Sequence, residues 1–414
     1  MAEVFLDVQT VEEVTEKLVI EFSGWKKKTE SIPFRSALGR ILSEDVRAEE
    51  DVPGFARSTV DGYAVRASDT GGASGTIPSV LEICGEIVMG EEALFSVSPG
   101  KCALIPTGGM LPPGSDAVVM LEDTEEFSAS EAGICRAVTC GENTVREDED
   151  IQSGRVLLKS GKKLRPQDLG VLSAAGIREV RVFRKWSLTI FSTGDELVRP
   201  EEKPRKGQVR DINTDMLSAL AESFGMTVNA KKVVRDDETL LKKEILEAMQ
   251  QSDIVAVSGG SSKGKKDAAA RVFREISDGG LLAHGLALKP GKPTVIACDR
   301  QSDTLLLGLP GHPAAAMMVF RILMKKLQCR LTGEAEEIPV SGRLAVNLPS
   351  APGRLTCQPV TVSREIGSDG RRLVTPLFGK SGLIRILSEA DGYIEIGRDS
   401  EGLRCGEAVD VHLF

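Results

Sequence analysis

The hydrophobic pattern of the amino-terminal half changes twice along the chain. Apolar residues three to four positions apart predict an amphipathic helix within residues 8–25, and a second short helix is expected within 34–42. From 51 to about 147, short apolar runs alternate with Gly and Pro turns, which is typical of a small all-β module. Residues 148–185 return to a mixed pattern with a helical stretch at 166–175. The β module is therefore interpreted as an insertion into an elongated helical domain.

Beyond Trp186, predicted strands alternate with predicted helices. This alternation favours a doubly wound, mainly parallel α/β sheet, in which helices connect successive strands. After Gly333 the sequence is strand-like to its end, and we expect a β-barrel or sandwich there. The predicted strands of the α/β unit are 187–191, 254–257, 294–297 and 305–309, and its predicted helices are 213–224, 237–250 and one that ends at Leu327.

Four structural units follow from these patterns. The elongated amino-terminal domain is discontinuous and comprises residues 1–47 and 148–185, because the inserted β domain occupies 48–147. The α/β domain covers 186–333, and the carboxyl-terminal β-barrel covers 334–414. A length of 414 residues agrees with several cores better than with one. The predicted fold class is thus multidomain, α/β plus β.

Composition restricts the location and the partners of the protein. No stretch approaches the roughly 20 apolar residues that span a bilayer, and the acidic amino terminus does not resemble a signal peptide. The eight cysteines form no Cys-x-x-Cys pair, which favours reduced thiols in a cytoplasmic compartment. A net charge of -9 argues against a general nucleic-acid binder. An anionic ligand would therefore need locally concentrated positive charge.

Glycine-rich polar segments follow the predicted strands, at the edge where open α/β sheets bind ligands. The segment 258–264 (SGGSSKG) can cradle an anion, because its glycines let backbone N–H groups converge and Lys263 adds charge. Lys289 and Lys292 flank a stiff Pro-Gly turn and suit an oxyanion. The alternatives are a simple connection for 258–264 and a solvated surface turn for the two lysines.

Two pairs of acidic residues are candidate cation ligands. Asp195-Glu196 and Asp236-Asp237 follow predicted strands and could hold a hard cation such as magnesium. Helix capping is the alternative, above all for Asp236 and Asp237. Asp61 lies in a turn-like segment and is equally explained as a turn former. Composition and spacing therefore indicate an α/β domain that binds a phosphorylated or oxyanionic small molecule, and they name no reaction.

Six motifs occur in a fixed order along nearly the whole chain. They are DVPGFARSTVDGYAV (51–65), IPTGG (105–109) with PPGSDAVV (112–119), FSTGDEL (191–197), SGGSS (258–262), LKPGKP (288–293) and LPGHP (309–313). Together they resemble the molybdopterin molybdenumtransferase, or MoeA, family and the related gephyrin E domain. Six ordered motifs are far more specific than any one of them.

The resemblance implies an L-shaped subunit of four subdomains with a MogA-like α/β domain. It implies a homodimer with a shared active site, in which the β insertion of one chain faces the α/β domain of the other. The implied reaction converts adenylylated molybdopterin and molybdate into molybdenum cofactor and AMP, with Mg²⁺ as cofactor. Contacts with the molybdopterin adenylyltransferase and with molybdoenzymes are also implied, whereas nucleic acids and membranes are not.

The family's functional residues can be carried over position by position. The matching carboxylates are Asp61, Asp150, Glu196, Asp236 or Asp237, and Asp267, and the matching hydroxyl of the β insertion is Thr107. The matching contacts to the adenylylated pterin and molybdate are Gly259, Gly260, Ser261, Lys289, Lys292, Pro310, Pro313, Arg354 and Ser381. Magnesium ligands are expected among Asp195, Glu196, Asp236 and Asp237, with Asp267 as a further candidate.

Three positions depart from the family pattern. His312 stands where an Asn is often found, the run 263–266 is unusually basic, and Asp267 is followed by Ala268-Ala269. With these departures the motifs do not decide whether the oxyanion is molybdate or tungstate, so a tungstate-inserting paralogue is one alternative. An enzyme that adenylylates molybdopterin is disfavoured because the chain holds one α/β domain. A non-catalytic, gephyrin-like scaffold is disfavoured because the charged site residues are retained.

Overall fold

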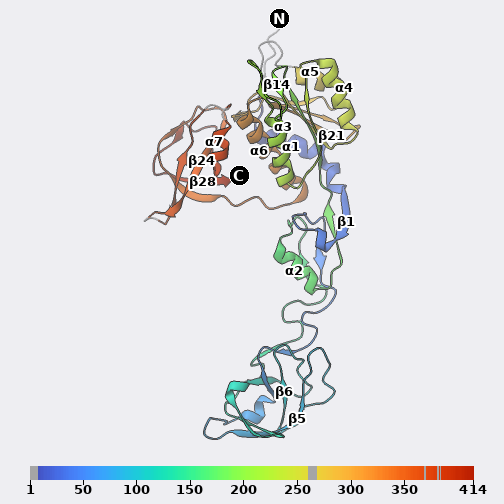
Figure 1. Cartoon of the computed structure of the whole chain (residues 1–414), viewed down its shortest axis with the longest axis vertical. Helices are drawn as coiled ribbons and strands as arrows, with labels where there is room; N and C mark the ends of the chain where they lie inside the picture. Colours follow the sequence, from blue (N-terminus) through green and yellow to red (C-terminus); the bar gives the residue numbers. More distant parts are fainter. Residues whose placement is uncertain (1–7, 260–267, 368–369, 380–381, 383) are drawn as a thin grey trace.

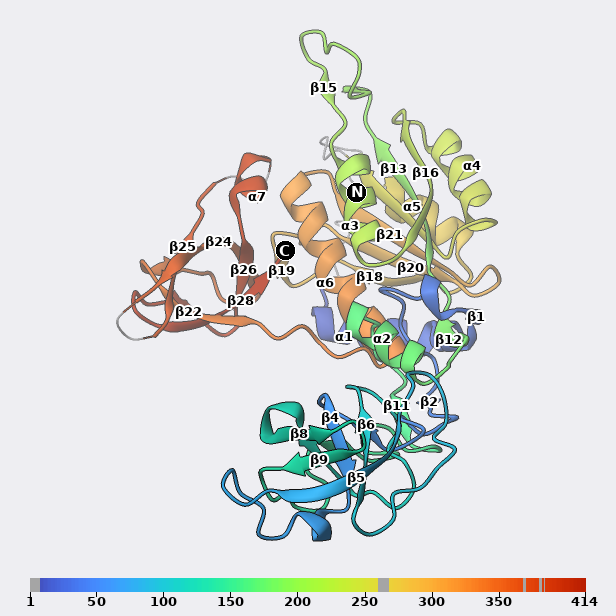
Figure 2. The ribbon, with the colours of Figure 1, turned by 60° about the horizontal axis from the view of Figure 1, so that its bottom comes forward.

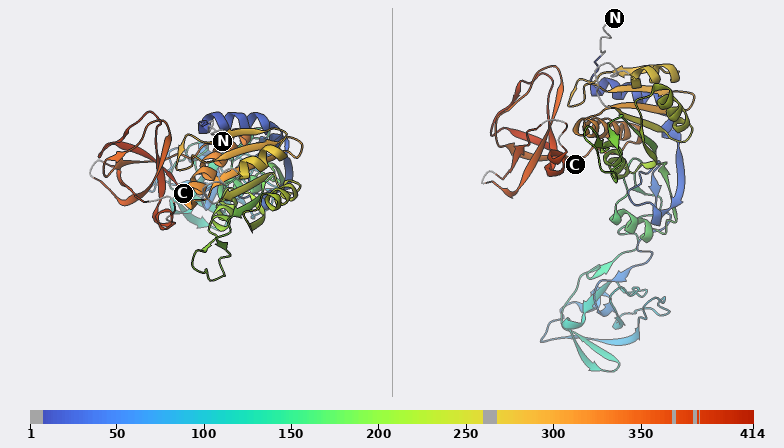
Figure 3. Two further views of the ribbon diagram at one scale, coloured as in Figure 1. Left: turned by 90° about the horizontal axis from the view of Figure 1, so that it is seen from above. Right: turned by 45° about the horizontal axis from the view of Figure 1, so that its top comes forward.

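The computed structural model describes residues 8–259, 268–367, 370–379, 382 and 384–414. The chain forms an elongated molecule (Figure 1). The α/β unit lies at one end with the carboxyl-terminal barrel beside it, and a narrow arm leads to the β insertion at the far end (Figure 3). Within the described residues, no helix has both the length and the apolar character needed to cross a bilayer.

The α/β unit is built on a six-stranded sheet with the order β16-β13-β17-β21-β20-β18. β16, β13, β17 and β21 run parallel to one another, which confirms the predicted mainly parallel sheet. β20 runs antiparallel to β21, because the four residues 300–303 between them are too few for a crossover. The bounds are β13 Ser187–Thr193, β16 Thr227–Val234, β17 Ile254–Gly259, β18 Leu281–His284, β20 Val295–Asp299 and β21 Thr304–Pro310.

Helices cover both faces of this sheet, as a doubly wound fold requires. One hydrophobic core joins the sheet to α3 (Asn213–Ser223) and α6 (Pro313–Thr332), and another joins the opposite face to α4 (Glu238–Met249) and α5 (Ala268–Ile276). The first core also contains α1 (Val11–Glu21). The amino-terminal helix therefore packs on the α/β unit, although the predicted domain boundaries assign it to the elongated domain.

The arm consists of paired chain segments and one helix. β1 (Thr29–Pro33) pairs with β12 (Glu179–Phe183), β2 (Val46–Arg47) pairs with β11 (Val156–Leu158), and α2 (Pro166–Ala174) lies beside them. A separate apolar core fills this region. The arm carries the β insertion on two antiparallel connections, so it determines where the insertion lies.

The helix expected within 34–42 is wrong, because only the short 3-10 turn Phe34–Ser36 forms there. Backbone N–H groups of two residues that follow this turn bond to other parts of the arm instead. Gly39 donates to Leu164 O at 2.8 Å, and Leu42 donates to Lys162 O at 3.0 Å. Tertiary pairing therefore outweighs the local helical pattern.

The β insertion and the carboxyl-terminal unit are separate β structures (Figure 2). The insertion contains a six-stranded sheet with the order β7-β4-β6-β5-β9-β8. In the last unit, the additional pairing of β24 with β26 closes β24-β25-β22-β28-β26 into a barrel, which confirms the predicted carboxyl-terminal barrel. The bounds in the insertion and its stem are β3 Arg57–Ser58, β4 Gly62–Val65, β5 Ser79–Glu86, β6 Lys101–Ile105, β7 Ala117–Met120, β8 Thr124–Ser128, β9 Glu131–Ile134 and β10 Thr144–Val145. Those of the last unit are β22 Val340–Leu344, β23 Leu348–Pro349, β24 Leu355–Ile366, β25 Arg372–Pro376, α7 Arg385–Glu389, β26 Gly392–Ile396, β27 Gly402–Leu403 and β28 Ala408–Leu413.

Two short pairings complete the fold. β14 (Leu197–Val198) pairs with β15 (Val209–Arg210) at the base of a ribbon that projects from the α/β unit (Figure 2). β19 (Leu288–Lys289) leaves the α/β unit and pairs with β24 of the barrel. The second pairing joins the α/β unit and the barrel through backbone hydrogen bonds.

Candidate functional site

The carboxyl ends of the four parallel strands lie in register at one edge of the sheet. Thr193 pairs with Val234 on one side and with Gly259 on the other, and Gly259 pairs with Pro310. Each strand therefore delivers its following loop to the same line. This edge is where open α/β sheets bind ligands, because the amino termini of the next helices point their N–H groups toward it.

A cavity of about 920 Å³ opens at this edge. A volume of that order suits a nucleotide-sized ligand. Three of the predicted cation ligands line it, namely Glu196, Asp236 and Asp237, and Arg235 adds a positive charge. The other lining residues are Thr193, Glu238, Leu241, Val257, Gly259, Ala268, Ala269, Pro293, Val295, Gly308, Leu309, Pro310, Gly311 and His312.

The predicted acid residues have different surroundings. Asp237 caps α4, because its Oδ1 accepts hydrogen bonds from the backbone N–H groups of Thr239 at 2.9 Å and Leu240 at 3.0 Å. Asp195 Oδ1 accepts from the backbone N–H of Asp236 at 3.3 Å. Among the described residues, no three His, Cys, Asp or Glu side chains form a metal-binding group. The four predicted ligands therefore do not converge on one cage, and the capping alternative holds for Asp237.

A buried polar network beneath the strand ends was missed from the sequence. Asp211 is buried, and its Oδ1 accepts from Ser192 Oγ at 2.8 Å and from the backbone N–H of Asn213 at 3.1 Å. The Thr214 hydroxyl donates to its other oxygen. Asp211 therefore ties the end of β13 to the start of α3. An acid two residues before a helical pattern is a capping signature that could have revealed this role.

Asn213 extends the network to the neighbouring strands. Its Nδ2 donates to Ser258 Oγ at 2.8 Å and to Gly311 O at 2.9 Å. Ser258 Oγ in turn donates to Pro310 O at 3.2 Å. The hydroxyl of Ser258, in the predicted anion segment, is therefore used inside the protein. The network ties the end of β17 to the end of β21 and to Gly311 beside the cavity.

The lysine turn lies where the α/β unit meets the barrel. β19 pairs Leu288 with Leu355 and Lys289 with Thr356, so Arg354 immediately precedes this pairing and lies beside the start of β19, before the turn. Gly291 has a φ of +137°, and a Cβ there would lie 2.5 Å from Val319 Cγ2. Only glycine fits this turn without strain. Lys289 and Lys292 are both exposed.

In the barrel, Gly382 follows the predicted site residue Ser381 and lies near His312. A Cβ built on Gly382 would be 3.9 Å from Cδ2 of His312, which is the residue before α6. Pro313 is the first residue of that helix, a position that suits proline. Four predicted site residues, Gly260, Ser261, Asp267 and Ser381, lie outside the described residues.

The predicted residues of the β insertion lie far from this cavity within the chain (Figure 1). Asp61 and Thr107 contact each other: the backbone N–H of Thr107 donates to Asp61 Oδ1 at 2.7 Å. This hydrogen bond and one from the Thr107 hydroxyl lower the pKa of Asp61. Asp150 is exposed at the foot of the insertion, where its backbone N–H donates to Val52 O at 3.1 Å. One chain alone does not bring these residues to the strand ends.

Fold and site together define a class of multidomain proteins in which a doubly wound α/β domain, flanked by a β insertion and a closed barrel, presents its strand ends to a ligand. Three family models match the chain in order. They are described as the MoeA N-terminal region (domain I and II) at residues 7–176, a probable molybdopterin binding domain at 189–328, and the MoeA C-terminal region (domain IV) at 341–414. The chain belongs to the MoeA family.

Individual relatives agree over their whole length. A Methanocaldococcus jannaschii protein named for molybdopterin biosynthesis is 31% identical, and the match covers 99% of this chain and 98% of that one. The molybdopterin molybdenumtransferase of Staphylococcus aureus is 29% identical, with 97% and 95% covered. A crystal structure of a molybdopterin biosynthesis MoeA protein from Pyrococcus horikoshii has a TM-score of 0.81 at 35% identity, with 98% of this chain and 99% of that chain covered.

Proposed function

We propose that this protein is a molybdopterin molybdenumtransferase, which inserts molybdate into adenylylated molybdopterin and releases AMP. The observation that carries the proposal is one large cavity at four aligned strand ends, whose lining includes Pro293 at the end of the lysine turn. The strand ends suit a nucleotide-linked, phosphorylated ligand, and the basic neighbourhood suits an oxyanion. The name of the Staphylococcus aureus relative supports this assignment.

In the proposed reaction the protein mainly orients two anionic reactants. Lys289, Lys292 and Arg354 would hold molybdate near the dithiolene sulfurs, while the loops after β17 and β21 hold the adenylylated pterin. Gly259 and Pro310 allow the ligand to approach the backbone at these strand ends. Orientation and electrostatic stabilisation suffice, and no covalent intermediate with the protein is required. Gly260, Ser261, Asp267, Pro313 and Ser381 complete the proposed contacts.

Magnesium is the cofactor that the family resemblance implies, and the acids of the cavity fit it. Glu196 and Asp236 both line the cavity, whereas one carboxylate oxygen of Asp237 already accepts hydrogen bonds that cap α4. Mg²⁺ is commonly bound by one or two carboxylates together with substrate phosphates, so a dedicated cage is not needed. Glu196 and Asp236 would hold the ion, with Asp195 and Asp237 nearby. When bound, it would neutralise negative charge on the pyrophosphate bridge.

The proposed active site is shared between two chains. Asp61, Thr107 and Asp150 are site residues by family resemblance, yet they lie at the far end of the arm. A homodimer in which the insertion of one chain faces the α/β domain of the other would bring them to the cavity. In such a dimer, the ionised carboxylate of Asp61 would be presented at a fixed position by Thr107. A cytoplasmic location and transient contacts with the adenylyltransferase and with molybdoenzymes belong to the same proposal.

The test is AMP release from adenylylated molybdopterin by the purified protein. We expect release that depends on molybdate, and a decrease of at least tenfold when Lys289→Met and Lys292→Met are combined. Lys206→Met is the matched control, because Lys206 is an exposed lysine of the β14–β15 ribbon and is expected to leave the rate unchanged. AMP release at the same rate with and without molybdate would refute the proposal, as would equal rates in the double lysine variant and in Lys206→Met.

The same assay separates the alternatives. Faster turnover with tungstate than with molybdate would identify a tungstate-inserting paralogue, which the His312 and Ala268 departures motivate. Formation of the adenylate from ATP and molybdopterin would identify the preceding enzyme instead. Absence of turnover with both oxyanions, together with failure to restore a cofactor-deficient cell, would favour the scaffold.

A further inference from the structure

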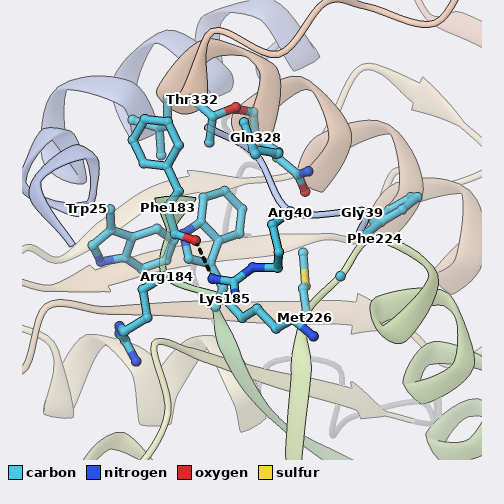
Figure 4. Close-up of a pocket in the computed structure, with 14 residues that line it drawn as sticks. Trp25, Gly39, Arg40, Phe183, Arg184, Lys185, Phe224, Met226, Gln328 and Thr332 are labelled. Atoms are coloured by element: carbon cyan, nitrogen blue, oxygen red, sulfur yellow. Dashed lines mark hydrogen bonds between the residues drawn. The ribbon is translucent and has the colours of Figure 1, made fainter. Parts of the chain in front are cut away.

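A second cavity lies at the junction between the arm and the α/β unit, away from the strand ends (Figure 4). Gly39, Arg40, Ile41 and Phe183 come from the arm, and Gln328, Leu331 and Thr332 come from the end of α6. The remaining lining residues, which belong to the α/β unit and the chain entering it, are Trp25, Arg184, Lys185, Trp186, Phe224, Gly225 and Met226. We call this space the junction cavity. Cavities between structural units are common ligand sites.

Arg40 presents unused hydrogen-bond donors in the junction cavity. Its side chain is only 11% exposed, and its Nη2 donates to Glu30 Oε1 at 2.5 Å and to Phe183 O at 2.7 Å. Nε and Nη1 have no hydrogen-bond partner among the described residues, and neither is sealed from solvent. A guanidinium carries five N–H donors, so three of them remain for a ligand. Because Arg40 lines the cavity, those donors are available to a molecule inside it.

The charges around the junction cavity leave a positive excess. The carboxylates Glu30, Asp253 and Asp303 pair with Arg40, Arg184 and Lys28. Lys185 is exposed and has neither an ion pair nor a hydrogen bond among the described residues, and it lines the same cavity as Arg40 (Figure 4). The charge of Arg40 is balanced by Glu30, so the excess is one positive charge, that of Lys185. The cavity therefore favours a negatively charged ligand.

The remaining walls limit the ligand's size. Trp25 and Trp186 pack with their ring centroids 4.9 Å apart, and Phe224, Met226 and Leu331 add apolar surface. The cavity has a volume of about 50 Å³. At roughly 10–15 Å³ for each water, this is room for about four waters, which is comparable to one tetrahedral oxyanion.

We propose that the junction cavity binds a compact oxyanion, held by Nε or Nη1 of Arg40 and by the ammonium group of Lys185. The bound anion would link the arm, through Arg40, to the chain entering the α/β sheet, through Lys185. Inorganic phosphate, sulfate and molybdate share the required chemistry. This site is separate from the lysine turn of the proposed active site, and the proposal does not depend on the reaction catalysed there.

Intrinsic fluorescence tests this proposal directly, because the protein has two tryptophans and both line the junction cavity. We expect a saturable change in tryptophan emission, with matching heat in titration calorimetry, when phosphate, sulfate or molybdate is added. Acetate, a planar anion, serves as the control and should bind more weakly than these three tetrahedral anions. Lys185→Met should weaken binding at least tenfold, and Lys185→Arg should largely restore it. Lys159→Met, which removes an exposed lysine of the arm, should bind like the unmodified protein.

A second pair of variants locates the anion. The double variant Lys289→Met and Lys292→Met should keep the fluorescence change, since it alters only the lysine turn. Loss of the change in that variant would assign the anion to the strand-end cavity and overturn the proposal. Equal affinity in the unmodified protein and Lys185→Met would also overturn it, as would the absence of both heat and emission change with all four anions.

Discussion

Arg321 on α6 is a buried cation that joins the α/β unit to the last strand of the barrel. Its side chain is almost inaccessible, and its Nη2 donates to Leu413 O and to Glu337 Oε2, the latter at 3.3 Å. The guanidinium carbon lies 5.8 Å from the ring centroid of Phe224 and 5.6 Å from that of Phe414. These contacts reach β28 and the linker before the barrel, so Arg321 is expected to hold the barrel against α6.

The substitution Arg321→Met keeps an apolar stem of similar length and removes the charge. The lost hydrogen bond from a charged donor is worth about 1.5–3 kcal/mol. The cation–π contact with Phe414 adds about 0.5–1 kcal/mol, and the half-exposed pair with Glu337 adds about 0–1 kcal/mol, whereas the contact with Phe224 lies within the α/β unit and does not contribute to docking. Relief of the buried charge's desolvation penalty offsets part of this loss. We expect a net loss of about 2 kcal/mol in barrel docking, or roughly thirtyfold in the docking equilibrium.

Hydrogen exchange measures this docking at β28. Backbone amides of Ala408–Leu413 should exchange roughly thirtyfold faster in Arg321→Met, because the strand is exposed more often. Arg321→Lys should recover part of the protection. Lys326→Met is the matched control on the same helix, since Lys326 pairs with Glu12 of α1 and not with the barrel. Protection of β28 within threefold of the unmodified protein, or equal acceleration in Lys326→Met, would refute the reasoning.

Three further predictions concern the site and its supports. Gly291→Ala should destabilise the protein by about 1–3 kcal/mol, seen as a lower unfolding temperature, because its Cβ would lie 2.5 Å from Val319. It should also weaken molybdate binding. Unchanged melting and titration curves would contradict this prediction. Burial opposes ionisation of Asp253, but hydrogen bonds from the backbone and hydroxyl of Ser187 outweigh it and lower the pKa of Asp253. The ionised Asp253 therefore contributes its full stabilisation above the ordinary pKa of 3.8, and this contribution is lost as pH falls through the lowered pKa. The free energy of unfolding in urea should be about 2 kcal/mol higher for the unmodified protein than for Asp253→Asn at pH 7, and this difference should shrink below pH 3.8. Asp237→Ala should cost about 1 kcal/mol in urea unfolding by removing the α4 cap, while Asp237→Asn should cost less; equal losses would argue against capping.

Regular periodicity made much of the fold predictable. Helices expected within 213–224 and 237–250 are observed as α3 (Asn213–Ser223) and α4 (Glu238–Met249), because their apolar faces repeat over three turns against the sheet. The pattern within 34–42 failed, since long-range hydrogen bonds within the arm fix that backbone. The antiparallel direction of β20 could have been inferred from the short segment 300–303.

The candidate site was predictable only as separate segments. Gly259 and Pro310 end two clear strands, so their meeting at one edge follows from parallel topology. The bonds of Asp211 to the start of α3 could have been inferred from its position before the helix, but its bond to Ser192 could not, because no local pattern reveals that distant partner. The neighbourhood of Lys289 and Arg354 was suggested by family resemblance alone, since a two-residue strand has no periodicity to read.

The pairing of β19 with β24 means that the two lysines of the turn cannot change position independently of the barrel. Leu288 and Lys289 are part of the barrel's hydrogen-bonded framework, although they belong in chain order to the α/β unit. Any tilt of the barrel would therefore pull the lysine turn with it and change its distance from the strand ends. If the turn binds the oxyanion as proposed, a ligand or mutation that reorients the barrel should also alter oxyanion affinity.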